Sequence, residues 1–220
     1  MRMNNRLNQP LQLHGKDLVE TDRFVYLGSV VNIDGGADED VKSRINKARV
    51  AFNTLRPIWN SRALSQHSKV RIFNTNVKAV LLYGSETWRV TNTITNKIQT
   101  FVNKCLRHIL NIRWPEKISN VELWKRTSQN PISQDIKKRK WGWIGPTLRK
   151  PTDNVTRQAL EWNPQGKRKV GHPKQSWRRS VKSEMNEAGM TWTQLKRAAH
   201  NRVHWRGVVA ALCSTGSQQE

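Results

Sequence analysis

The spacing of hydrophobic residues changes from strand-like to helical near residue 38. Residues 11–33 alternate between apolar and polar positions and include the run FVYLGSVVNI, which is rich in β-branched and aromatic side chains. This pattern predicts a small β-hairpin and one further strand. The turn signal Asp34-Gly35-Gly36 follows, and Asp38 is a suitable N-cap for a helix that begins there.

Three amphipathic helices are predicted next, over residues 38–56, 65–83 and 93–112. Apolar residues recur at intervals of three or four positions in each of them. Pro57 is expected to end the first helix, and Ser65 or Ser68 to cap the second, which ends before Gly84. Three such helices joined by short loops form a bundle.

The helical pattern is weaker beyond Pro115. Short helices are expected over residues 121–126, 133–141 and 155–160, and two longer ones over residues 176–188 and 191–212. Gly142, Gly145 and Pro146 are expected to break the helix that precedes them. We expect the polar tail from residue 214 to 220 to be disordered.

These patterns predict a mainly α fold. A small N-terminal β-hairpin (1–36) precedes a helical bundle (37–114) and a loosely packed, basic, Trp-containing helical region (115–213), and 214–220 form the tail. A chain of 220 residues is long enough to bury a hydrophobic core.

Charge is concentrated in the last two-thirds of the chain. The formal net charge is +23; residues 1–60 hold nine basic and seven acidic residues, and residues 61–220 hold 30 and nine. The positive electrostatic field of such a chain favours a polyanionic partner, and nucleic acid is the first candidate. A membrane surface is the alternative, but the sequence has neither a long apolar run nor a signal-peptide hydrophobic region. Two cysteines form no disulfide framework, so we expect an intracellular protein, in the nucleus.

The densest basic stretch, residues 137–179, holds 13 Lys or Arg residues, two acids and four tryptophans. Cations suit phosphates, and flat aromatic faces suit unstacked bases. The alternative is that the charges form a solvated face and that the tryptophans are core; we assign Trp192 and Trp205 to the core. The candidate nucleic-acid-binding residues are Lys138, Arg139, Lys140, Trp141, Trp162, Lys167, Arg168, Lys169, Lys174, Trp177, Arg178, Arg179, Arg202 and Arg206.

No catalytic residue, metal or cofactor is expected. Asp38, Glu39 and Asp40 are the one acidic cluster, and consecutive residues at a helix start point in different directions, so they suit the helix dipole better than a two-metal site. Cys105 with His108 and His200 with His204 have spacings compatible with zinc, but no second thiolate pair lies near them in the sequence. Buried Cys and surface His are the more usual arrangement.

Four motifs occur in a recognisable order: FVYLGSVVNIDGG, LLYGSETW, LEWNPQGKRKVGHPKQSWRRSVKSEMNEAGMTW and NRVHWRGVVAALC. Together they resemble the C-terminal part of the endonuclease–reverse transcriptase polyprotein of RTE-like non-LTR retrotransposons. The resemblance extends from about residue 11 to residue 213.

The resemblance implies a role for each region. Phe24, Tyr26, Leu27 and Gly28 would form a primer-grip hairpin, the three helices after it a polymerase thumb, and the basic region a surface that holds template RNA, primer or target DNA. The endonuclease and the catalytic palm of the family are not in this sequence, so the chain by itself is not expected to be active. Nucleic acid is the expected partner, and the palm a further one.

Three alternatives to a nucleic-acid-binding fragment stay open. The chain could complete a polymerase when the palm is supplied in trans. It could be a scaffold whose charge meets an acidic protein, or a retroelement relic without function.

Overall fold

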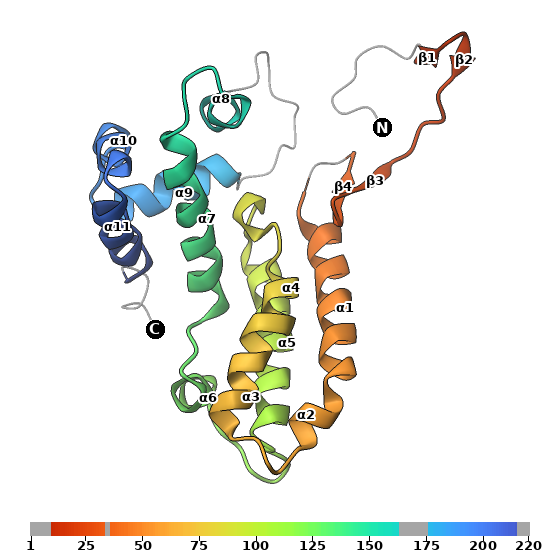
Figure 1. Cartoon of the computed structure of the whole chain (residues 1–220), viewed down its shortest axis with the longest axis vertical. Coiled ribbons are helices and arrows are strands. Elements are labelled where there is room, and N and C mark those ends of the chain that lie inside the picture. Colours follow the sequence, from red (N-terminus) through yellow and green to blue (C-terminus); the bar gives the residue numbers. More distant parts are fainter. Residues whose placement is uncertain (1–9, 34–35, 163–175, 215–220) are drawn as a thin grey trace. The chain divides into compact units, whose positions relative to one another are not determined.

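The computed structural model describes residues 10–33, 36–162 and 176–214. The fold is mainly α-helical with short β-strands at the N-terminus, as the sequence predicted (Figure 1). The chain divides into two compact units. The first combines residues 1–84 and 100–118, and the second combines residues 85–99 and 119–220, so helix α5 (Asn92–Ile109) contributes to both.

The N-terminal strands form two antiparallel hairpins where the sequence predicted one hairpin and a further strand. β1 (Gln12–Leu13) pairs with β2 (Lys16–Asp17), and β3 (Arg23–Tyr26) pairs with β4 (Ser29–Asn32). Leu27 and Gly28 connect β3 to β4 with φ of 48° and 81°. Two positive φ values in a two-residue loop match the twist of the strands on either side, and glycine adopts the second without strain.

Helix α1 (Asp38–Thr54) begins differently from the prediction. Its N-cap is Ala37, which makes no side-chain cap, so the assignment of Asp38 as N-cap is wrong. Asp38, Glu39 and Asp40 all lie in the first turn, where carboxylates complement the helix dipole. Asp40 is buried, and its Oδ1 accepts a hydrogen bond of 2.9 Å from the backbone N–H of Val30. This contact holds β4 against α1.

The rest of the first unit consists of short helical segments and the second half of α5. They are α2 (Arg56–Asn60), α3 (Gln66–Ile72), the π-helical η1 (Phe73–Lys78) and α4 (Ala79–Leu81). Pro57 lies in the first turn of α2, where its missing N–H is tolerated, and α1 has already ended at Thr54. Ser65 caps α3 as predicted, because its hydroxyl accepts from the N–H of Ser68 at 3.1 Å.

Aromatic packing and a buried thiol mark the interior of the first unit. The Phe52 ring stacks on Trp59 at 5.1 Å and meets Phe73 edge-on at 6.4 Å. The His108 ring of α5 also meets Phe52 edge-on. Cys105, on the same helix, is buried. Burial raises the pKa of Cys105 to about 12, so this thiol stays protonated at neutral pH.

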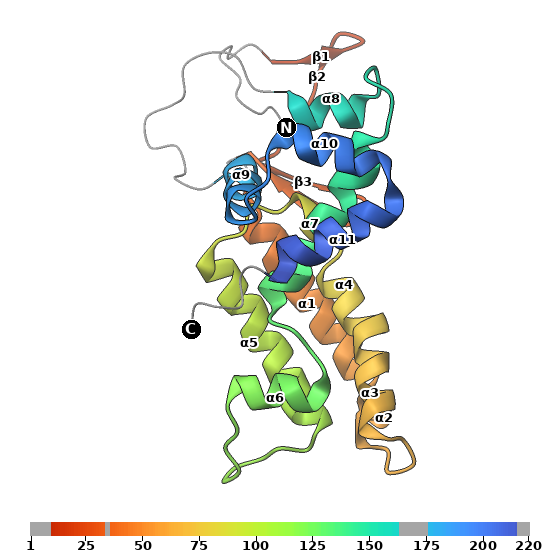
Figure 2. The same cartoon turned by 90° about the vertical axis from the view of Figure 1, so that its left-hand side faces the viewer.

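The second unit is built around α7 (Ile132–Leu148). Its other elements are η2 (Ser85–Thr87), the first part of α5, α6 (Asn120–Thr127), α8 (Val155–Glu161), α9 (Trp177–Glu187), α10 (Trp192–His200) and α11 (Arg202–Ser214). Figures 1 and 2 both show α10 and α11 alongside α7, in agreement with the packing of these helices.

Helix α7 continues through the three residues that were expected to break it. Pro146 lies inside the helix and removes one backbone hydrogen bond. Trp141, Ile144 and Leu148 are buried on one face. Because burying a large apolar side chain contributes about 1.5–3 kcal/mol, three of them offset a helix penalty of about 3 kcal/mol for proline. The expected break at residues 142–146 is therefore wrong.

The single helix predicted over residues 191–212 is in fact two. Asn201 has an extended backbone (φ −95°, ψ 112°) that ends α10. Its side-chain oxygen then accepts from the N–H groups of Val203 and His204 at 2.9 and 3.0 Å, which starts α11. The break sets the direction of α11.

The second unit also has a contiguous hydrophobic core, contrary to the loose packing that its composition suggested. Leu160 of α8, Val181 of α9 and Leu195 of α10 are buried together with residues of α7 and α11. Trp205 is one of them, with 4% of its surface exposed. Its assignment to the core is confirmed, and Trp192 packs partly buried against the same cluster.

Gly145 should be the residue of α7 least tolerant of a side chain. A Cβ atom there would lie 2.1 Å from Nε1 of Trp205 and 2.4 Å from its Cε2. Gly145→Ala should therefore lower the free energy of unfolding of the second unit by about 1–3 kcal/mol, as overpacking does. Gly142→Ala is the matched control, because nothing lies within 4 Å of a Cβ at that position. It should stabilise the helix by up to about 1 kcal/mol. Hydrogen exchange of the α7 and α11 amides would measure the change in stability of both variants. Equal exchange rates in Gly145→Ala and Gly142→Ala would contradict the expectation.

Candidate nucleic-acid interface

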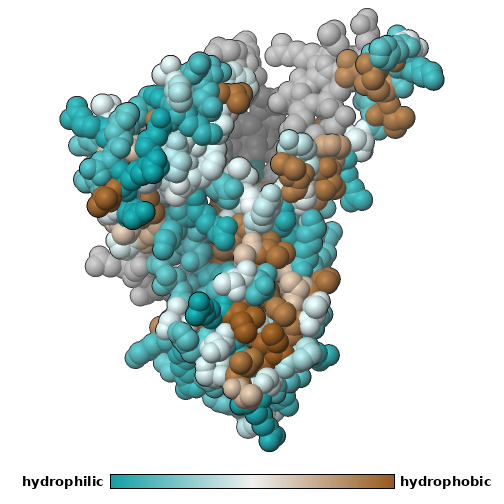
Figure 3. Space-filling model, in the orientation of Figure 1, coloured by the Kyte–Doolittle hydropathy of each residue, from teal (hydrophilic) through white to brown (hydrophobic). Residues whose placement is uncertain are grey.

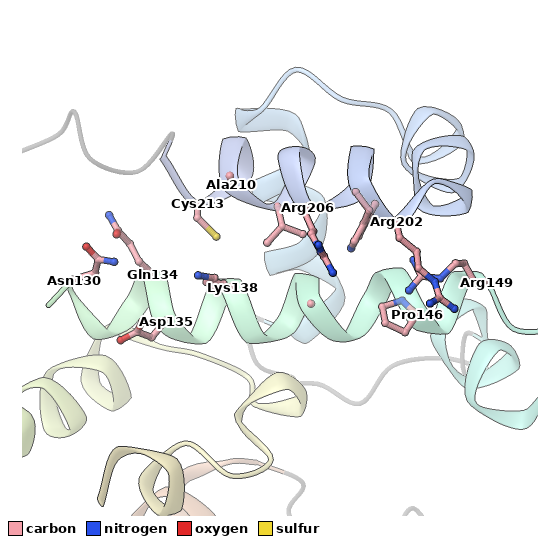
Figure 4. A pocket seen from close by; sticks show the side chains of 13 residues that line it. Asn130, Gln134, Asp135, Lys138, Pro146, Arg149, Arg202, Arg206, Ala210 and Cys213 are labelled. Atoms are coloured by element: carbon pink, nitrogen blue, oxygen red, sulfur yellow. The ribbon is translucent and has the colours of Figure 1, made fainter. Parts of the chain in front are cut away.

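A groove of about 640 Å³ runs between α7 and α11 in the second unit. One stripe of each helix lines it (Figure 4). The α7 stripe repeats every four residues, at Gln134, Lys138, Gly142 and Pro146. The lining residues are Asn130, Gln134, Asp135, Lys138, Gly142, Pro146, Arg149, Arg202, Trp205, Arg206, Val209, Ala210 and Cys213. Residues distant in sequence thus share one concave surface.

Short side chains make room for the groove. Gly142 has no side chain, and Ala210 has only a methyl group on the facing helix. Trp205 inserts against Gly145, and its Nε1 donates a hydrogen bond of 3.2 Å to the backbone carbonyl of Trp141. The indole therefore closes the bottom of the groove and holds α11 to α7.

Four cations line the groove against one carboxylate, that of Asp135. Lys138, Arg202 and Arg206 are exposed, and they make no hydrogen bond or ion pair with another residue in the part of the chain that the structure describes. Figure 4 shows Arg202 and Arg206 extending from α11 toward α7, with Arg202 beside Arg149 at the Pro146 end. Four like charges against one carboxylate form a surface suited to an anion.

Arg149 was missed by the sequence analysis. Its Nη1 donates a hydrogen bond of 2.9 Å to the carbonyl of Ala199, at the end of α10. Arg149 lies beside Arg202 at the Pro146 end of the groove (Figure 4). Its place in the basic stretch 137–179 could have identified it. It was missed because it follows the end of α7, and the sequence predicted that helix to end near Trp141.

Two of the predicted nucleic-acid contacts are wrong. Lys140 and Trp141 expose 2% and 0% of their surface. Nζ of Lys140 pairs with Glu184 at 2.5 Å and bonds to Oγ of Ser180 at 3.0 Å. Nε1 of Trp141 donates to the same Glu184 carboxylate at 2.7 Å. Neither side chain reaches solvent: both bond to side chains of α9, and the Trp141 ring also packs against Trp205 of α11.

The other predicted tryptophans differ in exposure. Trp162 is 63% exposed, so its ring is accessible. Trp177 is half-buried: its Nε1 donates to the carbonyl of Glu86 at 2.7 Å, and its ring meets Trp143 edge-on at 6.2 Å. Since its indole is held by these contacts, only part of its surface faces solvent.

The remaining predicted cations lie away from the groove lining or outside the described residues. Arg139 and Arg179 are exposed. Arg178 is half-buried and donates to the carbonyl of Ala159 at 3.2 Å. Lys167, Arg168, Lys169 and Lys174, and the tail 214–220, fall in stretches that the structure does not describe.

The β3–β4 hairpin presents a second candidate surface, in the first unit. The Phe24 and Tyr26 rings stack at 6.5 Å and are 52% and 62% exposed, and Leu27 is 73% exposed. Figure 3 shows hydrophobic side chains gathered over both N-terminal hairpins. The opposite side is anchored to α1: Nζ of Lys47 donates to the Gly28 carbonyl at 2.8 Å. The exposed aromatic pair is thus held on a fixed support.

Metal and membrane chemistry find no support in the described residues. No three His, Cys, Asp or Glu side chains within 10–33, 36–162 and 176–214 converge on a site that could hold a metal ion. No helix of that part is long and apolar enough to cross a bilayer.

The different positions of Lys138 and Lys140 predict different effects of the same substitution. Lys140→Met removes the partner of the partly buried Glu184 carboxylate and should lower the free energy of unfolding by about 3 kcal/mol. Molecules of Lys140→Met that are folded should bind nucleic acid with unchanged affinity. Lys138→Met should leave stability within about 0.5 kcal/mol and weaken binding. Urea unfolding and fluorescence anisotropy would separate the two, and weaker binding by folded Lys140→Met would contradict the assignment.

Comparisons with known proteins point to a mobile-element origin. A family described as a domain of unknown function (DUF6451) matches residues 51–83. A protein of Caenorhabditis elegans described as an uncharacterized transposon-derived protein is 26% identical over 94% of this chain and 79% of its own length. No solved structure matches. The chain is therefore similar to a transposon-derived protein along almost its whole length.

Proposed function

We propose that this chain is a nucleic-acid-binding fragment of a non-LTR retrotransposon reverse transcriptase. It holds template RNA, primer or target DNA and has no catalytic site of its own. The observation that carries the proposal is the groove between α7 and α11, where Lys138, Arg149, Arg202 and Arg206 converge. The order of the four sequence motifs and the similarity to a transposon-derived protein support the retrotransposon origin.

The chemistry of the groove suits phosphate groups. Guanidinium groups bind phosphate oxygens with paired hydrogen bonds and stay charged at any physiological pH. A net charge of +23 adds long-range attraction to a polyanion. Contacts of this kind position a strand without specifying its sequence, so binding should depend steeply on salt and show little sequence preference. A nuclear location, where RNA and target DNA meet, fits this role.

The stacked aromatic pair of the β3–β4 hairpin favours a second candidate function. Phe24, Tyr26, Leu27 and Gly28 stand where the resemblance places a primer grip, and exposed apolar surface of this kind marks a binding site. In this second function the hairpin completes a polymerase whose palm another chain supplies.

Removing the groove cations should weaken binding more than removing the same number of cations elsewhere. Arg202→Gln with Arg206→Gln should raise the Kd for RNA about tenfold or more and lower the salt slope by about one to two, since each phosphate contact adds about 0.7 for a single strand. Lys182→Gln with Arg197→Gln is the matched control. Both residues are exposed in the second unit and outside the groove lining. Equal losses in the two double variants would place binding elsewhere.

Primer extension distinguishes the two functions. The isolated chain should extend no primer, and the second function predicts extension only when a palm-containing chain is added. In that mixture the double variant Phe24→Ser with Tyr26→Ser should abolish the added primer extension. Because both rings are exposed, their loss should leave the fold intact. Extension that is equal with and without this chain would exclude the second function.

A further inference from the structure

We infer that the groove between α7 and α11 accepts one unpaired strand of nucleic acid and discriminates against a duplex. This inference rests on the proposed function and specifies the form of its ligand. It depends on the size of the groove, on the apolar character of its floor and on the distribution of charge along it.

The groove has the size of a small-molecule pocket. Its volume of about 640 Å³ lies within the range of about 300–1,000 Å³ that is typical of ligand pockets. A short piece of one strand fits such a space. A duplex is a wide cylinder with its bases turned inward, so it would touch only the rim.

The floor of the groove is apolar, which phosphates alone would not require. Pro146 lies on the α7 side, and Trp205, Val209 and Ala210 lie on the α11 side. Trp205 is 4% exposed, so it contributes a wall and not a stacking platform. The faces of unpaired bases are the apolar surfaces of a nucleic acid, and only a single strand makes them available.

The planar cations of the rim complement such bases. Arg202 and Arg206 extend across the groove from α11 (Figure 4). A guanidinium plane stacks on a base as well as pairing with a phosphate. Each arginine can therefore lie between a base and the backbone of the same strand.

Charge is unequal along the groove, which gives the bound strand a preferred placement. Arg149 and Arg202 lie together at the Pro146 end, whereas the other end, near Cys213, holds the amides of Asn130 and Gln134 and one cation of the lining, Lys138 (Figure 4). Two guanidinium groups at one end attract phosphate more strongly than one ammonium group at the other, so the backbone should enter at the arginine end. The amides at the opposite end suit the hydrogen-bonding edges of a base.

Filling the groove without removing a charge tests the inference. Gly142→Leu places a side chain in the groove, and a Cβ at this exposed helical position meets nothing within 4 Å. Gly207→Leu is the matched control, because Gly207 of α11 is equally open and lies outside the lining. Ala210→Leu and Ala211→Leu form a second pair of neighbouring exposed alanines, of which only Ala210 lines the groove.

The measurement is anisotropy with labelled single strands of about 12 nucleotides, RNA and DNA, and with duplexes of the same sequences. Gly142→Leu and Ala210→Leu should each weaken single-strand binding about tenfold and leave duplex binding as in the wild type. Gly207→Leu and Ala211→Leu should change neither. A bound strand should also slow alkylation of Cys213, which lines the groove, while Cys105 is buried and reports unfolding.

Three results would overturn the inference. They are equal affinity of the wild type for single strand and duplex, equal single-strand affinity of the groove-filling variants and their controls, and displacement of the strand by polyglutamate of matched charge as effectively as by unlabelled strand. If either of the first two occurs while Arg202→Gln with Arg206→Gln still loses binding, the proposed function stands and only the single-strand specificity fails. Equal displacement by polyglutamate would overturn the proposed function as well, because it would show a site for any acidic polymer. If that double variant also binds as its control does, the proposed function fails too.

Discussion

The contact between Trp205 and Gly145 determines the candidate site. The indole of α11 occupies the space that a side chain at residue 145 would fill, and its Nε1 bonds to the α7 backbone. Close approach at this one point brings α11 onto α7. The small residues that follow on the exposed side, Gly142 and Ala210, then leave a groove open above it. The packing of α11 on α7 therefore forms both part of the core and the cationic groove.

A basic stretch on a helix has faces with different roles. Lys138 and Lys140 are two residues apart, yet one lines the groove and the other is buried against Glu184 and Ser180. A helix turns by about 100° per residue, so neighbours in a charge run point to different surroundings. The buried lysine ties α7 to α9 and, with Trp141, shares one carboxylate. Net charge indicates a polyanionic partner but does not say which cations meet it.

The N-terminal β3–β4 hairpin of the first unit also combines anchoring contacts with an exposed candidate surface. The inner side of β3–β4 is held by polar contacts to α1, through Asp40 to Val30 and Lys47 to Gly28. The outer side carries the exposed Phe24 and Tyr26 rings. The anchoring contacts involve the Val30 N–H and the Gly28 carbonyl, in β4 and the turn, while every residue of β3 is exposed. Its aromatic pair is therefore exposed on a hairpin that α1 holds in place.

The sequence alone determined the helical class, most helix positions, the basic character of the C-terminal part and the core role of Trp205, because periodicity and charge are local properties. Two features depended on tertiary structure. Helix α7 runs through Pro146 because core burial outweighs proline's local penalty. The division at Asn201, by contrast, is a local signal that the sequence analysis missed, because the Asn201 side chain caps α11 through the backbone N–H groups of Val203 and His204. The groove brings Lys138 together with Arg202 and Arg206, which are 64 and 68 residues further along the chain, and Arg149 lies with them and bonds to Ala199. Which cations share a surface is a property of helix packing, and no pattern along the chain encodes it directly.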